Sequence, residues 1–338
     1  MPLISVLIPC YNAQDTVGEA LQSLARQTCM DFEVILLDDG SQDGTLSVLE
    51  RWSAMDSRFK VISKSHGGII SALNHGLRYC RGQFIARMDS DDRCMPNRFA
   101  QQLAYLESNR DVALVSCRVQ PFPAEDVRDG FRIYLEWMNS LVSDMDIRRE
   151  IFIESPFAHP SVLIRREWLD QMGGYEEHGW PEDYDLWMRM FLAGARFARL
   201  PDVLLEWREH RARLTRVDSR YSLENFLRLK AHYLMQGPIK NRDAVILWGA
   251  GMTGRRLSKH LARQGAPLAA FIDIDPEKIG GTRRGLPIFP PVLLADLWRS
   301  YNHPVILAAV GARGARTLIR QRLSAMQLVE GVDWWCVA

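Results

Sequence analysis

Short apolar runs alternate with segments of helical periodicity over the first hundred residues. The pattern predicts strands at residues 4–8, 33–37, 60–63 and 83–88, and helices at residues 17–27, 45–55 and 69–81. Such alternation is typical of an α/β fold, in which crossover helices join the strands of a mostly parallel sheet. Beyond residue 112 the pattern is less regular, and it predicts helices at residues 138–153, 183–192 and 221–235.

A second strand–helix–strand pattern starts at Ala244. It predicts strands at residues 245–248 and 268–272, with a glycine-rich turn and a helix at residues 255–264 between them. The charge also changes here, since residues 1–240 hold 29 basic and 34 acidic side chains and residues 241–338 hold 13 and 7. We therefore expect a first domain at residues 1–215, a helical linker at 216–241, and a small Rossmann-like α/β domain at 242–338.

Composition excludes several classes of protein. Of 338 residues, 47% are hydrophobic and 25% charged, which is typical of a globular chain rather than a disordered one. A net charge of +1 gives no argument for binding nucleic acid. The six cysteines form no Cys-x-x-Cys pair, and no run approaches 18 apolar residues. We expect a protein of the reducing cytoplasm, with at most a peripheral contact to the inner face of the membrane.

Three of the predicted strands end in polar clusters. The clusters are Pro9-Cys10-Tyr11-Asn12, Asp38-Asp39-Gly40-Ser41 and Asp89-Ser90-Asp91-Asp92. Ligands of open α/β sheets bind outside the carboxyl ends of the strands, where neighbouring loops converge. The three clusters are therefore expected to face one cleft.

The last of these clusters suits a divalent cation. The chain contains four Asp-x-Asp triplets, but only the one at Asp89 follows a predicted strand beside other polar strand ends. Side chains two residues apart in an extended segment point the same way, and carboxylate oxygens are preferred by Mn²⁺ and Mg²⁺. Asp91 is the favoured ligand. For Asp92, capping of the helix that follows is an equally good interpretation.

Seven segments in order carry a resemblance. They are residues 5–12, 21–28, 34–41, 71–74, 88–92, 173–175 and 182–189. Over about residues 1–215 the chain resembles the family 2 glycosyltransferases with the GT-A fold. The resemblance implies a nucleotide-sugar donor, a saccharide or lipid-linked acceptor, Mn²⁺ or Mg²⁺ as cofactor, and an inverting transfer in the synthesis of surface polysaccharide or other glycans.

The resemblance also implies roles for single residues. Tyr11 would lie near the base of the donor, Asp39 would accept a hydrogen bond from that base, and Asp89 would face the ribose or the diphosphate. Asp91 would hold the metal ion, and His210 is a further candidate metal ligand. The remaining donor-site candidates are Pro9, Asn12, Asn74 and Ser90.

Asp183 is implied as the general base. The attacking hydroxyl must lose a proton, and a carboxylate near the reacting carbon can take it. The alternative is that Asp183 caps a helix over residues 184–192. His159 matches another recurrent segment of the family without an assigned role. The turn His66-Gly67-Gly68 either approaches the donor or is a plain glycine turn.

The glycine-rich turn near residue 250 has the context of a nucleotide site. Gly249-x-Gly251-x-x-Gly254 follows a strand, opens a helix and is followed by Asp273 at the end of the next strand. We weigh a second nucleotide site at these four residues equally with a purely structural or dimerising domain, so a homo-oligomer stays open. Two rival functions remain: a nucleotide-dependent oxidoreductase or epimerase centred on Gly249, and a sugar-nucleotide sensor without catalysis.

Overall fold

The computed structural model describes the backbone of residues 1–338 and the side chains of residues 1–125 and 127–338. The chain forms two compact units. The first unit comprises residues 1–147, 156–178 and 182–217, and the second comprises residues 148–155, 179–181 and 218–338. The second unit therefore includes two short segments, 148–155 and 179–181, that lie within the range expected for the first domain.

Contacts within the second unit explain why residues 148–155 belong to it. The ring of Phe152 packs edge-on against Trp335 at 5.4 Å between centroids. Glu150 forms ion pairs with Arg316 and Arg320. These contacts fasten the segment to the carboxyl-terminal part of the chain.

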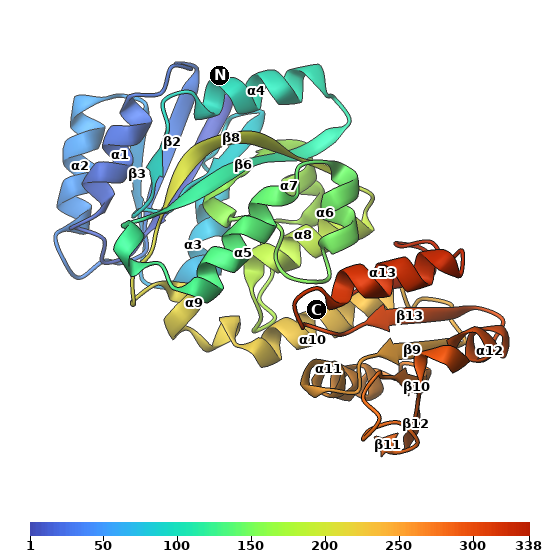
Figure 1. The fold of residues 1–338 in the computed structure, drawn as a ribbon. Helices are drawn as coiled ribbons and strands as arrows, with labels where there is room; N and C mark the ends of the chain where they lie inside the picture. Colours follow the sequence, from blue (N-terminus) through green and yellow to red (C-terminus); the bar gives the residue numbers. More distant parts are fainter. The chain divides into compact units, whose positions relative to one another are not determined.

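The first unit is built on an eight-stranded mixed sheet with the order β3-β2-β1-β4-β7-β6-β8-β5 (Figure 1). Its strands are β1 (Ile4–Cys10), β2 (Phe32–Asp38), β3 (Phe59–Ser63), β4 (Phe84–Arg87), β5 (Arg93–Cys94), β6 (Val112–Phe122), β7 (Leu163–Arg165) and β8 (Arg196–Arg208). Strands β3, β2, β1 and β4 pair in parallel, whereas β7 runs antiparallel to both β4 and β6. The predicted α/β class is confirmed. The four strands that were predicted are the parallel neighbours β3, β2, β1 and β4, whereas the parallel pair β6 and β8 was not predicted.

The helices of the first unit include those predicted at residues 17–27, 45–55, 69–81 and 183–192. They are α1 (Val17–Ala25), α2 (Thr45–Met55), α3 (Gly68–Leu77), α4 (Arg98–Ser108), α5 (Asp129–Ser140), α6 (Asp144–Glu150), α7 (Arg166–Met172), α8 (Glu182–Leu192) and α9 (Leu214–Val217), with short 3₁₀ turns η1 (Ala124–Asp126) and η2 (His159–Ser161). In α1, the buried residues Val17, Ala20, Leu21 and Leu24 recur every three or four positions. This spacing places one apolar stripe against the sheet.

The prediction of a single helix over residues 138–153 is wrong. Helix α5 ends at Ser140, and α6 begins at Asp144. The Ser143 hydroxyl donates to the Asp146 carboxylate at 2.6 Å and accepts a hydrogen bond from the Asp146 amide at 3.2 Å. This local hydrogen bonding is the mechanism by which serine starts a helix, so it begins a new one where the periodicity alone predicted continuation.

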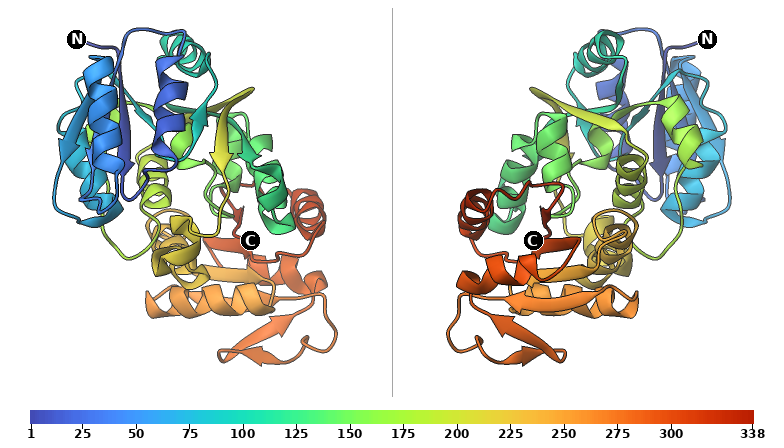
Figure 2. Two further views of the ribbon diagram at one scale, coloured as in Figure 1. Left: turned by 90° about the vertical axis from the view of Figure 1, so that its left-hand side faces the viewer. Right: turned by 90° about the vertical axis from the view of Figure 1, so that its right-hand side faces the viewer.

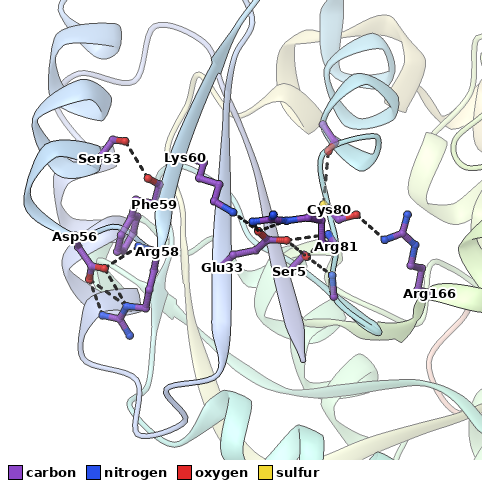
Figure 3. Close-up of polar contacts among 12 residues, drawn as sticks. Ser5, Glu33, Ser53, Asp56, Arg58, Phe59, Lys60, Cys80, Arg81 and Arg166 are labelled. Carbon is purple, nitrogen blue, oxygen red and sulfur yellow. Dashed lines mark hydrogen bonds and ion pairs between the residues drawn. The ribbon is translucent and has the colours of Figure 1, made fainter. Parts of the chain in front are cut away.

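At the amino ends of β1 and β2, one buried glutamate joins several elements (Figure 3). Glu33 accepts hydrogen bonds from the Ser5 hydroxyl at 2.8 Å, the Lys60 ammonium at 2.6 Å and the Arg81 amide at 2.8 Å. The Arg81 guanidinium also contacts this carboxylate at 3.2 Å. Both carboxylate oxygens are therefore satisfied by the protein.

The second unit contains a six-stranded sheet with the order β11-β12-β10-β9-β13-β14. Its strands are β9 (Ala244–Trp248), β10 (Leu268–Ile272), β11 (Thr282–Arg283), β12 (Leu286–Phe289), β13 (Pro304–Ala308) and β14 (Trp334–Cys336), and its helices are α10 (Leu223–Gln236), α11 (Met252–Arg263), α12 (Leu294–Arg299) and α13 (Ala315–Ala325), with the 3₁₀ turns η3 (Ser219–Tyr221) and η4 (Pro291–Leu293). All its pairings are parallel except β11 with β12. Helices α11 and α13 lie on opposite faces of this sheet (Figures 1 and Figure 2). Within the described residues, no helix is long and apolar enough to span a membrane.

Candidate functional site

Strands β2, β1 and β4 are neighbours and parallel, so their polar carboxyl ends lie at one edge of the sheet. The first two polar loops are tied together by hydrogen bonds. The Asn12 amide donates to the Ser41 hydroxyl at 3.0 Å, and the Asn12 side-chain oxygen accepts from the Gln42 amide at 2.8 Å. Asn12 has a φ of 48°, a left-handed conformation that asparagine tolerates. The structure thus gives Asn12 a role in shaping the loops, and Pro9 is buried in β1.

Tyr11 presents an aromatic surface at this edge. Its side chain is 44% exposed. The Tyr11 ring stacks on the His66 ring at 4.1 Å between centroids and 25° between planes. The turn at His66 is therefore brought against Tyr11, and the pair forms a flat surface of the kind on which a nucleobase stacks.

Asp39 is buried beside this pair and is surrounded by donors. Its carboxylate accepts hydrogen bonds from the Lys64 ammonium at 2.7 Å, the Gly67 amide at 3.1 Å and the Gly68 amide at 2.8 Å. The His66 imidazole lies 2.9 Å from the same carboxylate. Asp39 therefore holds the turn that leads into α3, and in this structure its oxygens are engaged by the chain's own donors.

Three aspartates meet just beyond β4. Asp89, Asp91 and Asp92 each offer a carboxylate oxygen, and these oxygens lie within 4.8 Å of one another. The His210 imidazole, on the segment after β8, lies 3.0 Å from the Asp91 carboxylate. The structure therefore brings together the two residues predicted to hold a metal ion. Ser90 lies between the aspartates and is half-buried.

The cluster has more negative charge than the surrounding protein neutralises. Asp92 Oδ1 accepts from the Arg208 amide at 2.8 Å, but its buried Oδ2 has no hydrogen-bond partner among the described residues. Burial, and then the charges of Asp91 and Asp89, raise the pKa of Asp92 well above its usual value. Burial also raises the pKa of Asp89. An oxygen-rich group short of positive charge fits a divalent cation.

Asp92 does not cap the following helix. Helix α4 begins at Arg98 with Asn97 as the residue before it, and β5 lies between Asp92 and this helix. The capping interpretation of Asp92 is therefore wrong, because a two-residue strand that pairs with β8 delays the start of the helix.

Asp183 lies inside the first turn of α8, which begins at Glu182. Asp183 is thus the second residue of the helix and not the residue that precedes it, although its Oδ1 does accept a hydrogen bond from the first-turn amide of Tyr184 at 2.7 Å. Asp183 is half-buried. Burial, and then the neighbouring charge of Glu182, raise the pKa of Asp183 to about 8. A carboxyl group with this pKa can exchange a proton near neutral pH.

A chain of polar contacts supports this helix end. The His159 Nε2 atom lies 2.8 Å from the Tyr175 hydroxyl, and its Nδ1 lies 4.0 Å from the Glu182 carboxylate. Burial lowers the pKa of His159 well below its usual value, so the imidazole is neutral. Asn74 holds Tyr175 by its backbone, accepting from its amide at 2.9 Å and donating to its carbonyl at 2.7 Å. The Asn74 amide group is thus engaged with the loop before α8.

One residue beside the aspartate cluster was not predicted from the sequence. Arg87 is the last residue of β4, only 5% exposed, and forms an ion pair with Asp89. A signal exists in the sequence, since Arg87 is the one charged residue in the apolar run 84–88 before Asp89. A buried arginine needs polar or acidic partners, and Asp89 is the nearest acidic residue along the chain.

In the second unit, close packing and backbone conformation within the glycine-rich turn explain two of its glycines. A Cβ atom on Gly254 would lie 1.9 Å from the Gly249 carbonyl oxygen, and Gly249 has a φ of 115°. The Asp273 carboxylate accepts a hydrogen bond from the Ala250 amide at 2.8 Å. A Cβ atom on Gly251, in contrast, would meet no atom within 4 Å. The second nucleotide site at these residues stays a prediction, as does the nucleotide-binding character of the unit.

Comparison with protein-family models gives a match. Residues 5–173 match the model described as glycosyl transferase family 2. This range contains the polar strand ends and the aspartate cluster.

Curated relatives agree with that match. The chain is 34% identical over 209 residues to the amylovoran biosynthesis glycosyltransferase AmsE of Erwinia amylovora, covering 61% of this chain and 76% of the relative. It is 30% identical over 210 residues to an Escherichia coli UDP-Gal:alpha-D-GlcNAc-diphosphoundecaprenol beta-1,3-galactosyltransferase, covering 61% and 74%. Among solved structures, residues 1–349 of S. aureus TarS in complex with UDP-GlcNAc match with a TM-score of 0.56 and 20% identity, covering 78% of this chain and 71% of that one. This last likeness concerns the fold.

Proposed function

The chain belongs to glycosyl transferase family 2, and we propose that it is a metal-dependent, inverting enzyme. In this proposal it moves a sugar from a nucleoside diphosphate to a saccharide or lipid-linked acceptor during polysaccharide synthesis. One relative is named for amylovoran synthesis, which supports a role in polysaccharide synthesis, and another for a diphosphoundecaprenol substrate, which supports a lipid-linked acceptor. The observation that carries the proposal is the cluster of three aspartates just beyond β4, whose negative charge the surrounding residues do not fully neutralise.

The donor would lie across the carboxyl ends of β2, β1 and β4. We assign the base to the exposed ring of Tyr11, which stacks on His66. Asp39 acts on the base through the turn it fixes, since its carboxylate already binds Lys64 and the amides of Gly67 and Gly68. The diphosphate would then reach the aspartates at the end of β4.

Asp91 and His210 would hold a cation, with Asp89 and Asp92 beside it. The donor set fits Mn²⁺ or Mg²⁺, because it combines carboxylate oxygens with one imidazole and leaves Asp92 Oδ2 unpartnered. When bound, such an ion stabilises the negative charge that develops on a leaving diphosphate.

Asp183 would take the proton from the attacking hydroxyl. Its Oδ1 is occupied by the Tyr184 amide, which leaves Oδ2 as the accepting atom. Because its pKa is raised to about 8, we expect kcat/KM to rise with pH up to about that value as the carboxyl group ionises. A direct attack assisted by a base needs no covalent intermediate on the protein and inverts the sugar carbon.

A thermal-shift screen tests the proposal. UDP-, GDP- and dTDP-sugars would be added to the full chain with and without Mn²⁺, beside NAD(P) and beside the Asp91→Ala variant. Saturating ligand stabilises a protein by about 2.7 kcal/mol at a hundredfold excess over Kd. We expect stabilisation by a nucleotide sugar that needs both Mn²⁺ and Asp91. Stabilisation by NAD(P) alone would favour the rival oxidoreductase centred on Gly249.

A further inference from the structure

Arg208, the last residue of β8, contacts the loop of the aspartate cluster at two points. Its amide donates to Asp92 Oδ1 at 2.8 Å, and its side-chain Nε donates to the Asp91 carbonyl at 2.7 Å. Two residues further along the chain, the His210 imidazole lies 3.0 Å from the Asp91 carboxylate. The end of β8 therefore holds the backbone of Asp91 and presents a candidate metal ligand to its side chain.

The guanidinium of Arg208 is also fixed by contacts outside the cluster. Its Nη2 atom pairs with the Glu19 carboxylate of α1 at 2.6 Å, and its central carbon lies 4.4 Å from the centre of the Phe122 ring. The side chain is 18% exposed. Because it contacts a carbonyl, a carboxylate and an aromatic ring at once, this side chain has little freedom to move.

The segment after β8 is anchored as well. The Glu209 amide donates to the Phe122 carbonyl at 2.8 Å, which continues the pairing of β6 with β8. The buried Glu209 carboxylate pairs with Arg213 at 2.9 Å. His210 therefore lies in a stretch of chain that is held both before and after it.

An arginine beside a cation site has two opposing effects. Its charge repels a divalent ion, so a role through charge alone predicts tighter binding of the ion when the arginine is removed. A contact that orients a metal ligand acts in the other direction, because its loss weakens metal binding by about 10- to 100-fold. Here the guanidinium donates to the carbonyl of Asp91, and its charge is paired with Glu19. This geometry favours the second effect.

We propose that Arg208 is a positioning residue of the cation site, which sets the affinity for Mn²⁺ or Mg²⁺ by fixing the backbone of Asp91 beside His210. This inference rests on the proposed function, because it takes the aspartate cluster as the site of the cation. Arg208 is not itself a ligand, since a guanidinium has no acceptor atom to offer a metal ion.

Two substitutions separate the hydrogen bond from the charge. Arg208→Gln and Arg208→Met both remove the positive charge and the ion pair with Glu19. The glutamine side chain carries an N–H donor at the position of the arginine Nε, whereas methionine carries none. A difference between the two variants therefore reports the hydrogen bond to the Asp91 carbonyl.

Arg93 of β5 provides a matched control. Its guanidinium also lies over the Phe122 ring, at 4.0 Å, and it also pairs with Glu19, at 3.7 Å. Its shorter ion pair is with Glu206 of β8 at 2.7 Å. The substitution Arg93→Met therefore removes a cation from the same ring and the same acidic partner, but it leaves the hydrogen bond to the Asp91 carbonyl in place.

The first readout does not need activity. The Kd of Mn²⁺ for the full chain is measured from the EPR signal of free Mn²⁺, without nucleotide and with UDP or GDP. We expect Kd to rise about tenfold or more in Arg208→Met and to stay within about threefold of the wild type in Arg208→Gln and Arg93→Met. Unchanged or tighter binding by folded Arg208→Met overturns the proposal, as does equal weakening in Arg208→Gln.

A second pair of variants keeps the proposal testable if Arg208→Met does not fold. Glu19 is 51% exposed, so Glu19→Gln should preserve the fold while it removes the partner that orients Arg208. Glu206→Gln makes the same change of charge at the partner of Arg93. We expect the rise in the Kd of Mn²⁺ to be about threefold larger for Glu19→Gln than for Glu206→Gln. Equal effects of the two substitutions overturn the role of Arg208.

The second readout separates positioning from a general loss of structure. Release of nucleoside diphosphate from UDP-, GDP- and dTDP-sugars is titrated with Mn²⁺. In Arg208→Met we expect half-maximal release at about tenfold more Mn²⁺, with kcat within about threefold of the wild type at saturation. A kcat that stays low at saturating Mn²⁺ contradicts a role in metal affinity.

The two readouts together distinguish this inference from the proposed function. If Mn²⁺ binding depends on Arg208 as expected while the wild type releases no nucleoside diphosphate, the proposed function fails and the role of Arg208 stands. If the wild type releases nucleoside diphosphate and folded Arg208→Met binds Mn²⁺ as the wild type does, the inference alone fails. A wild type that binds no Mn²⁺, with or without nucleotide, overturns both.

Discussion

Buried acidic groups differ between the two ends of the parallel strands β3, β2, β1 and β4, which are called the amino edge and the carboxyl edge below. At the amino edge, burial raises the pKa of Glu33, but hydrogen bonds from Lys60, Ser5 and Arg81 outweigh it and lower that pKa to about 2 (Figure 3). Just beyond the carboxyl end of β4, burial and neighbouring acids raise the pKa of Asp92 well above its usual value, and in the first turn of α8 burial and Glu182 raise the pKa of Asp183 to about 8. Asp39, also at the carboxyl ends of the strands, is paired with Lys64 and with backbone amides, so the contrast lies between Glu33 and the two acids Asp92 and Asp183.

The difference supports a stabilising role for Glu33 and, within the proposed function, a binding role for the acids beyond β4. Glu33 stabilises the fold in its ionised form, because the protein supplies every donor it needs. Asp92 keeps an unpartnered oxygen, and the ionised form of Asp183 is destabilised. Groups whose charge is left uncompensated in this way cluster at functional sites. A ligand or cation would supply the missing compensation at the carboxyl edge.

Replacement of Asp183 is expected to have the largest effect. Asp183→Asn removes the base while keeping the size of the side chain, so turnover should fall by a factor of about 10² to 10⁴. Donor binding should persist, because the aspartate cluster is intact. Release of nucleoside diphosphate measures the first effect, and the thermal shift with donor and Mn²⁺ measures the second. Unchanged turnover would remove Asp183 from the mechanism.

Replacement of Glu33 should affect stability instead. Its pKa is lowered from 4.5 to about 2, which corresponds to about 3 kcal/mol of stabilisation by the ionised form. This contribution is complete above pH 4.5 and is lost as the pH falls through 2. Glu33→Gln should therefore lower the unfolding free energy at pH 7 by up to about 3 kcal/mol in urea denaturation. Activity per folded molecule should not change. A loss of activity in the folded variant would contradict the claim that Glu33 contributes to stability alone.

The pH dependence of stability should have the opposite sign at Asp183. A carboxyl group whose folded pKa is raised is most compatible with the fold when protonated, so its contribution declines between its unfolded pKa of 3.8 and about 8. The melting temperature of Asp183→Asn should therefore exceed that of the wild type increasingly from pH 5 to pH 8. Thermal melts in matched buffers without metal measure this difference. A constant difference across that range would mean that Asp183 ionises normally.

The smallest effect is expected at a half-exposed ion pair of the amino edge. Asp56 contacts Arg58 at 2.6 Å, with side-chain exposures of 24% and 19% (Figure 3). Solvent weakens such a pair, so Asp56→Asn should cost about 0.5–1 kcal/mol in urea denaturation at pH 7. A loss as large as that of Glu33→Gln would show that exposure does not distinguish these acids.

Local sequence patterns were sufficient to predict the strands and helices of residues 4–88. The strand and helix periods of residues 4–88 placed their elements within a few residues, and the polar strand ends met as expected. The pairing of Asp91 with His210 joins residues 119 positions apart, and only the family resemblance indicated it. The capping interpretation of Asp92 failed because pairing of β5 with β8 is a long-range contact. Arg87 was missed for another reason: its ion-pair partner Asp89 is only two residues away, but the sequence does not show that the guanidinium is buried.

The most direct test of the account is release of nucleoside diphosphate from UDP-, GDP- and dTDP-sugars, measured with Mn²⁺ and with a metal chelator. Wild type, Asp91→Ala, Asp183→Asn and Glu33→Gln would be compared at pH 8. The account predicts metal-dependent release by the wild type and by Glu33→Gln, and its loss in both aspartate variants. Release that persists without metal, or that survives in Asp91→Ala and Asp183→Asn, would contradict the assignment of the carboxyl edge as the catalytic site.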